Sequence, residues 1–91
     1  MSRAFVNDDR DESGRPRRRF TLPPRDDPGF DAAAAAALLE AARDGVTGDA
    51  EQETGYYWGE VRLRPHVERI LADAHRTGDD RLEQLAARFL K

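Results

Sequence analysis

The sequence contains no cysteine, and this absence excludes disulfide bonds, thiol catalysis and cysteine-ligated zinc. Chains without cysteine are typical of reducing compartments, so we expect a cytoplasmic protein. The chain also lacks a run of about 18 apolar residues, which a membrane-spanning helix requires. The first residues lack the apolar segment of a secretory signal. The sequence therefore predicts a soluble protein without membrane attachment.

Residue types that support catalysis or metal binding are few. His66 and His75 are the only imidazoles, and they lie on one predicted helix. At about 100° per residue, their spacing points them to opposite faces, which excludes a shared metal ion on an unbroken helix. Ser2 and Ser13 lie in a charged segment that offers nothing to orient a nucleophile, and the glycines form no phosphate-binding loop. We expect no enzymatic activity, no metal and no cofactor.

Charged residues are abundant, at 36% of the chain, and they divide it into two parts. Residues 1–29 contain seven arginines and six acidic residues, a net charge of +1; residues 30–91 contain eight basic and twelve acidic residues, a net charge of -4. Residues 7–29 are also rich in proline and poor in apolar side chains. Burial of so few apolar side chains cannot offset the entropy cost of ordering the chain. We predict a flexible arm at 1–29 and a small helical domain at 30–91.

The second part of the chain predicts an all-α fold of three to four helices. The expected bounds are about 31–44, 48–54, 64–77 and 80–90. Asp31 is the expected N-cap of the first helix, its alanines have the highest helix propensity, and Gly45 suits a left-handed C-terminal cap. No segment alternates in the manner of a strand.

The last two predicted helices have clear start and stop signals. Pro65 occupies a favoured first-turn position, Gly78 ends the third helix, and Asp80 with Glu83 approximates a capping box for the fourth. Apolar residues recur every three or four positions in both helices, which predicts one buried face on each. The short link between them predicts an antiparallel pair.

Three adjacent aromatic residues, Tyr56, Tyr57 and Trp58, lie between two glycines in the predicted loop before the third helix. A domain of this size has a core worth only about 3–5 kcal/mol, so Trp58 is expected to fill it, between the alanines of the first helix and the last two helices. The tyrosine hydroxyls are then expected at the surface. Alternatively, Tyr56 or Tyr57 lines a groove that binds a partner.

A short apolar motif at the start of the arm is a candidate partner-binding segment. Arg3, Phe5 and Val6 suit a partner's groove or a sheet edge to which an extended segment adds. In the alternative interpretation, Phe5 and Val6 fold back onto the core of this domain.

A cluster of arginines further along the arm is the candidate nucleic-acid site. Arg15, Arg17, Arg18 and Arg19 are suited to phosphate contacts, and Phe20 to stacking on a base. Acidic residues lie on both sides of the cluster, so a solvated linker or a protein-docking patch is the alternative interpretation.

The opening residues MSRAFV, followed by acidic residues, resemble the N-terminal leader of some bacterial Gre-like transcription elongation factors. The resemblance extends at most from Met1 to Asp9, and it departs from the pattern at Asn7, where a basic residue is expected. Nothing after residue 30 is similar to the coiled coil or the C-terminal domain of that family, so no catalytic residue has a counterpart here. The resemblance implies an arm used near bacterial RNA polymerase.

Taken together, these features predict a non-enzymatic bacterial adaptor or regulatory protein that binds a protein partner, in the setting of the transcription machinery. Weak nucleic-acid binding through the cluster from Arg15 to Arg19 is one alternative. A self-associating helical module, present as a homodimer, is the other, because the core is small and the last helix is strongly amphipathic.

Overall fold

The computed structural model of the chain describes residues 18–91, which form an all-α domain without strands. The elements are α1 (Phe30–Arg43), α2 (Thr47–Thr54), the short 3-10 helix η1 (Val61–Leu63), α3 (Arg64–Thr77) and α4 (Asp80–Leu90). The predicted fold class is confirmed. Predictions for Arg3, Phe5, Val6, Arg15 and Arg17 lie outside the described residues.

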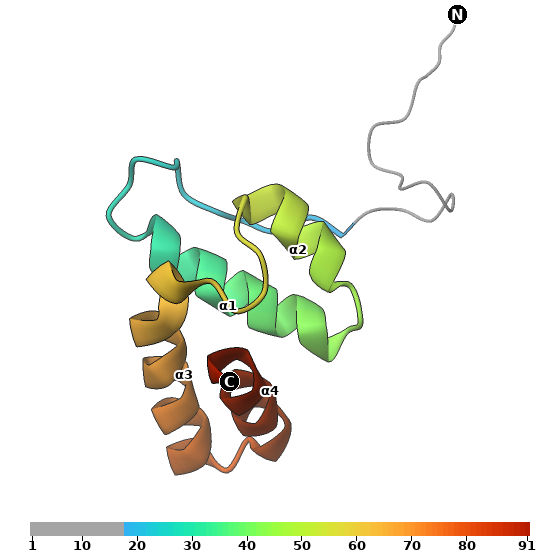
Figure 1. Cartoon of the computed structure of the whole chain (residues 1–91), viewed down its shortest axis with the longest axis vertical. Helices are drawn as coiled ribbons and strands as arrows, with labels where there is room; N and C mark the ends of the chain where they lie inside the picture. The colour runs from blue at the N-terminus through green and yellow to red at the C-terminus, as the bar shows by residue number, and fades with distance from the viewer. Residues whose placement is uncertain (1–17) are drawn as a thin grey trace, which may run out of the picture.

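Helix α1 occupies the centre of the domain, with α2 against one side and the α3–α4 pair against the other (Figure 1). The last two helices run antiparallel and form the closest helix pair (Figure 1). Their bounds agree with the prediction because the local signals are strong. Gly78 adopts the left-handed conformation at φ 77°, and the Asp79 N–H donates to the Ala74 carbonyl at 2.9 Å, which closes α3.

The start of α1 differs from the prediction. Gly29 is the N-cap, and Asp31 lies in the first turn without capping it. The chain enters the helix through a turn in which the Asp27 side chain accepts a hydrogen bond from Gly29 N–H at 2.7 Å, and the Asp27 carbonyl accepts one from Phe30 N–H at 3.0 Å. A side-chain acceptor two residues before the cap replaces the expected one, as is common for aspartate in turns.

The cap of α4 also lies one residue earlier than predicted. Asp79, and not Asp80, is the N-cap, and its carboxylate accepts the Leu82 N–H at 3.2 Å. Two adjacent aspartates offer the same local chemistry, so the sequence pattern does not distinguish them. Arg43 on α1 also bonds to Asp79, which selects this residue as the cap.

The core forms where the apolar faces of α1, α3 and α4 meet. In the alanine run of α1, Ala34, Ala35 and Ala37 are buried while Ala36 is exposed. These small side chains allow close approach of the neighbouring helices. The large side chains that fill the remaining space come from all of the long helices and η1: Phe30, Leu38, Leu39, Leu63, Val67, Leu85 and Phe89.

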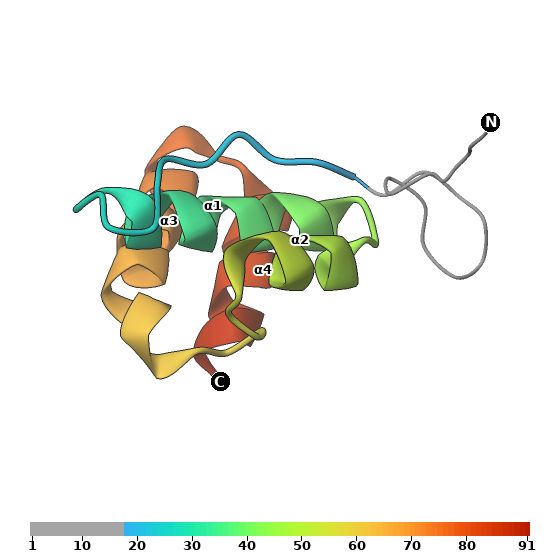
Figure 2. The same cartoon turned by 90° about the horizontal axis from the view of Figure 1, so that it is seen from above.

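Residues 18–22 lie against the helices, although the sequence predicts them to be part of the flexible arm. Phe20 and Leu22 are partly buried against the core, and the segment runs beside α1 and α2 in both views (Figures 1 and 2). Composition underestimates this packing because only two apolar side chains are involved and the remaining contacts are between charges. The packed part of the chain therefore begins before Phe30. We refer to residues 18–22 as the strap.

Candidate functional site

The aromatic loop between α2 and η1 directs its three rings to three different places. Gly55 ends α2 in the left-handed conformation. The Glu51 carboxylate accepts a hydrogen bond from the backbone N–H of Trp58 at 2.9 Å. The Thr54 hydroxyl oxygen accepts the Tyr56 N–H at 3.1 Å. These contacts hold the loop backbone to the end of α2, and adjacent side chains therefore face different surroundings.

Trp58 packs against the core, as expected, but it is half-buried. Its ring meets Phe89 of α4 edge to face, with the ring centroids 4.9 Å apart. Trp58 thus covers the core from the side of α4. The prediction that it fills the core is confirmed only to this extent, because part of the indole stays at the surface.

Tyr56 is held by charged neighbours. Its hydroxyl donates to the Asp31 carboxylate at 2.7 Å, and its ring lies 6.3 Å from that of Phe30. The hydrogen bond with Tyr56 also raises the pKa of the Arg62 guanidinium, and the charge of Asp31 acts in the same direction. Asp31, predicted as a helix cap, therefore anchors the aromatic loop to α1. The Tyr56 side chain therefore stabilises the position of the loop through its contacts with Asp31 and Phe30.

Tyr57 points to solvent with 75% of its surface exposed, and Val61 is 74% exposed. Among residues 18–91 these are the two large hydrophobic side chains that remain exposed. A turn separates them, closed by the Glu60 N–H donating to the Tyr57 carbonyl at 3.1 Å. Tyr57 also lines a shallow pocket of about 220 Å³ with residues of α2 and its end: Gly48, Glu51, Gln52 and Gly55. The sequence predicted Tyr57 as a candidate binding residue but not Val61. The one sequence feature that indicates exposure of Val61 is its position outside the apolar stripe of the third helix.

The described members of the arginine cluster contact this domain's own acidic residues. Arg18 pairs with Glu40 at 3.2 Å and also with Asp44, while Arg19 Nε lies 3.4 Å from Glu53. Phe20 is partly buried against the core, with the Arg18 guanidinium over its ring at 5.1 Å. The stacking of Phe20 on a base stays a prediction, and in this structure the ring has intramolecular contacts instead.

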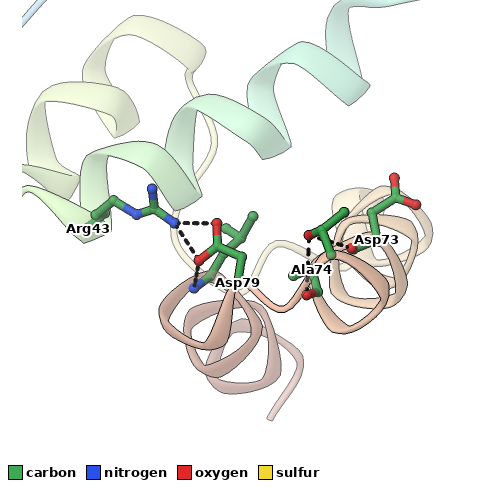
Figure 3. A network of polar contacts seen from close by, with 6 residues as sticks. Arg43, Asp73, Ala74 and Asp79 are labelled. Atoms are coloured by element: carbon green, nitrogen blue, oxygen red, sulfur yellow. Dashed lines mark hydrogen bonds and ion pairs between the residues drawn. The ribbon is translucent and has the colours of Figure 1, made fainter.

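A groove of about 430 Å³ lies between α1, α3 and the start of α4, and the sequence did not predict it. Its apolar lining comes from Ala36, Leu39, Ile70, Ala74 and Leu82. Arg43 reaches from α1 to both carboxylate oxygens of Asp79, at 2.9 and 3.0 Å (Figure 3). The Thr77 hydroxyl bonds to the carbonyls of Asp73 and Ala74, at 3.0 and 3.4 Å, which closes the last turn of α3. At the polar side of the groove, the Arg43–Asp79 contact thus joins α1 to the start of α4.

The Arg43–Asp79 contact makes the α1–α4 connection sensitive to acid. Hydrogen bonds from Arg43 and from the Leu82 N–H hold the pKa of the Asp79 carboxyl below its ordinary value. A carboxyl with a lowered folded-state pKa contributes stability above its unfolded-state pKa. That contribution is lost as the pH falls through the folded-state pKa.

Asp79→Asn is expected to lower the urea midpoint at about pH 7, because asparagine keeps the cap acceptor but loses the charge paired with Arg43. The difference from the wild type should shrink below about pH 4, where the unfolded-state carboxyl and then the folded-state carboxyl take up protons. Urea titrations at both pH values measure this. Asp80→Asn, which removes the neighbouring carboxylate, is the control and should retain the wild-type loss of stability in acid. A constant difference for Asp79→Asn across the pH range would contradict the assignment.

The histidines lie apart. His75 is exposed, with Nδ1 3.0 Å from a Glu83 carboxylate oxygen, while His66 Nδ1 is buried without a hydrogen-bond partner. Within residues 18–91 no group of three or more His, Asp or Glu side chains is arranged to hold a metal ion. In the same part of the chain, no helix has the length and apolar character needed to cross a bilayer.

The fold and these surfaces define a small all-α domain with an exposed tyrosine and an exposed valine on the two sides of one turn, and with an extended strap before α1. No protein-family model, no curated protein and no solved structure matches the chain.

Proposed function

We propose that this chain is a non-enzymatic adaptor or regulatory protein that binds a protein partner through the surface around Tyr57 and Val61. The observation that supports the proposal most directly is the exposure of both side chains, at 75% and 74%, in a domain with few large apolar residues to bury. Tyrosine supplies a large contact area at low entropy cost and is enriched at protein interfaces. A contiguous exposed apolar patch marks such an interface, and we propose that both side chains belong to one patch.

The backbone that presents Tyr57 is fixed on both sides. On one side, the Tyr56 hydroxyl is hydrogen-bonded to Asp31. On the other, the Trp58 ring packs on Phe89, and the Trp58 backbone N–H donates to Glu51. A side chain presented by a held backbone loses less conformational freedom when it binds, which favours affinity. This supports Tyr57 as an anchor and gives Tyr56 the role of support.

The arm extends the same proposal. Arg3, Phe5 and Val6 are a second partner contact, and the resemblance of MSRAFV to the leader of Gre-like factors suggests a bacterial cytoplasmic setting near the transcription machinery. Nucleic-acid binding through the arginine cluster has less support, because Arg18 and Arg19 are paired with Glu40, Asp44 and Glu53.

Photo-crosslinking from position 57 tests the proposal in cells. A photoreactive phenylalanine analogue at Tyr57 is expected to capture one defined protein, and the capture should survive nuclease. The same analogue at Gln84, an exposed position on α4, is the matched control and should capture little. Crosslinks between copies of the chain alone would favour the self-associating module, and nuclease-sensitive crosslinks would favour nucleic acid.

The captured protein then allows affinities to be measured. Tyr57→Ala should weaken binding at least about tenfold, because truncated interface tyrosines commonly cost more than 1 kcal/mol. Phe5→Ala should also weaken binding while leaving the melting temperature unchanged. Equal affinity of the wild type and Tyr57→Ala would contradict the proposed surface, and equal affinity of Phe5→Ala would remove only the arm from it.

A further inference from the structure

The strap contacts the helices in the manner of a bound extended peptide. Its residues alternate in burial: Arg18, Phe20 and Leu22 are half-buried, while Arg19 and Thr21 are exposed, although the Arg19 guanidinium still pairs with Glu53. A period of two is the geometry of an extended segment with one face on a surface. Extended peptides bound to protein grooves are recognised in the same way, through pockets for alternate side chains.

The surface under the strap is acidic and complements its arginines. Glu40 and Asp44 lie at the end of α1 and both pair with Arg18, while Glu53 of α2 pairs with Arg19. The Asp49 carboxylate, at the start of α2 and only 5% exposed as a residue, accepts the backbone N–H of Arg18 at 2.9 Å. The acidic groups thus contact both the side chains and the backbone of the strap.

Apolar contacts complete the site. Phe20 and Leu22 pack against the core. Beside them, the strap residues Arg18 to Thr21 form one wall of a groove of about 390 Å³, and Ala33, Ala36, Ala37 and Glu40 of α1 form the other. The strap thus places an arginine, an aromatic residue and a leucine at alternate positions against the domain.

The connection between the strap and α1 allows the strap to leave without unwinding the helix. Residues 24–29 form their own turn, in which the Asp27 N–H donates to the Pro24 carbonyl at 2.9 Å. The Asp27 side chain and carbonyl hold the start of α1 independently of the strap. The strap is also secured in part by ion pairs at the surface, with 34% of the Arg18 and 59% of the Arg19 side chain exposed, and exposed ion pairs are individually weak.

We propose that the acidic surface of α1 and α2 under the strap, which we call the acidic groove, is a recognition site for an extended Arg-x-aromatic-x-Leu segment of a partner protein, and that the strap occupies it as an intramolecular inhibitor. The partner segment displaces residues 18–22 and takes over the contacts with Glu40, Asp44 and Asp49. This site uses residues different from Tyr57 and Val61, so its test does not depend on the function proposed above.

The test uses the full-length chain and a fluorescein-labelled peptide with the sequence of residues 17–24, RRRFTLPP. The wild type is expected to bind this peptide weakly, because a tethered strap competes at an effective concentration of about millimolar. The double substitution Phe20→Ala and Leu22→Ala weakens the strap and should raise the peptide affinity at least about tenfold, measured by fluorescence anisotropy. A control peptide in which the residues corresponding to Arg18 and Phe20 are replaced by glutamate and alanine should not bind.

A second set of substitutions tests the acidic groove. We call the protein with Phe20→Ala and Leu22→Ala the opened chain. Adding Glu40→Gln and Asp44→Asn to the opened chain should return the peptide affinity to the wild-type level. Arg18→Glu, which repels the strap from Glu40 and Asp44 but keeps its apolar side chains, provides an independent way to open the groove and should give the same gain.

The proposal is overturned if the opened chains keep their far-UV circular dichroism and bind the peptide no more tightly than the wild type does. It is equally overturned if Arg18→Glu and the double substitution both unfold the domain, because the strap would then be an integral part of the fold. Wild-type protein that sediments as a dimer and is dissociated by the peptide would assign the groove to the strap of a second copy and would exclude the intramolecular inhibitor.

Discussion

Phe89→Ala is expected to unfold most of the domain at room temperature. The Phe89 side chain is only 2% exposed and lies where α4 meets the core, with the Trp58 ring against it at 4.9 Å. Replacing a buried phenylalanine by alanine costs about 3–5 kcal/mol. A domain of this size has a total stability of about the same magnitude, so the substitution removes most of the margin. Far-UV circular dichroism should show a large loss of helix, and Trp58 fluorescence should shift to the red.

The neighbouring residue supplies the control. Arg88 is exposed on the same helix turn, and Arg88→Ala should stay within about 0.5 kcal/mol of the wild type in urea titrations. A Phe89→Ala protein that unfolds cooperatively within about 1 kcal/mol of the wild type would show that the contact between Trp58 and α4 contributes little to the core.

Ala35→Leu is expected to cause the second largest loss of stability. Ala35 is fully buried in the central helix, which packs against α2, α3 and α4. A leucine there has no free volume, and overpacking of a well-packed core typically costs about 1–3 kcal/mol. Ala36→Leu is the matched control, since Ala36 is exposed on the same helix and leucine has nearly the helix propensity of alanine. Thermal melting should separate the two proteins clearly.

Equal melting temperatures for these two leucine variants would contradict the packing of α1. The comparison is informative because the sequence shows six consecutive alanines that are chemically identical. Only the assembled fold distinguishes the alanines that face another helix from those that face solvent. Ala36→Leu also reports on two grooves, because Ala36 lines both the groove between α1 and α3 and the groove between α1 and the strap.

The two proposed binding sites differ in how they are regulated. Tyr57 and Val61 are exposed in this fold, whereas the acidic groove of α1 and α2 is covered by the strap. An adaptor with one open and one covered site would engage two partners in a defined order. Measuring the RRRFTLPP affinity in the presence of the protein captured from position 57 tests this order directly.

The candidate site shows where prediction from sequence ends. Tyr56, Tyr57 and Trp58 are adjacent and chemically similar, and a loop has no periodicity that assigns each of them a direction. Asp31, Glu51 and Phe89 decide their orientations, and these partners come from α1, α2 and α4. Asp31 and Phe89 lie far from the loop in the chain, and Glu51, seven residues before Trp58, bonds to the Trp58 backbone, so no local pattern assigns the directions of the rings.

The sequence by itself determined the all-α class, a count of three to four helices and the bounds of α3 and α4. These features depend on local physics: helix propensity, apolar periodicity, a proline in the first turn and a glycine that adopts a positive φ after the last. The tertiary structure alone decided that Asp79 caps α4, that Tyr57 is the exposed member of its triplet, and that residues 18–22 lie against α1 and α2. Those outcomes depend on charge and shape complementarity between segments far apart in the chain, which exists only once the helices have packed.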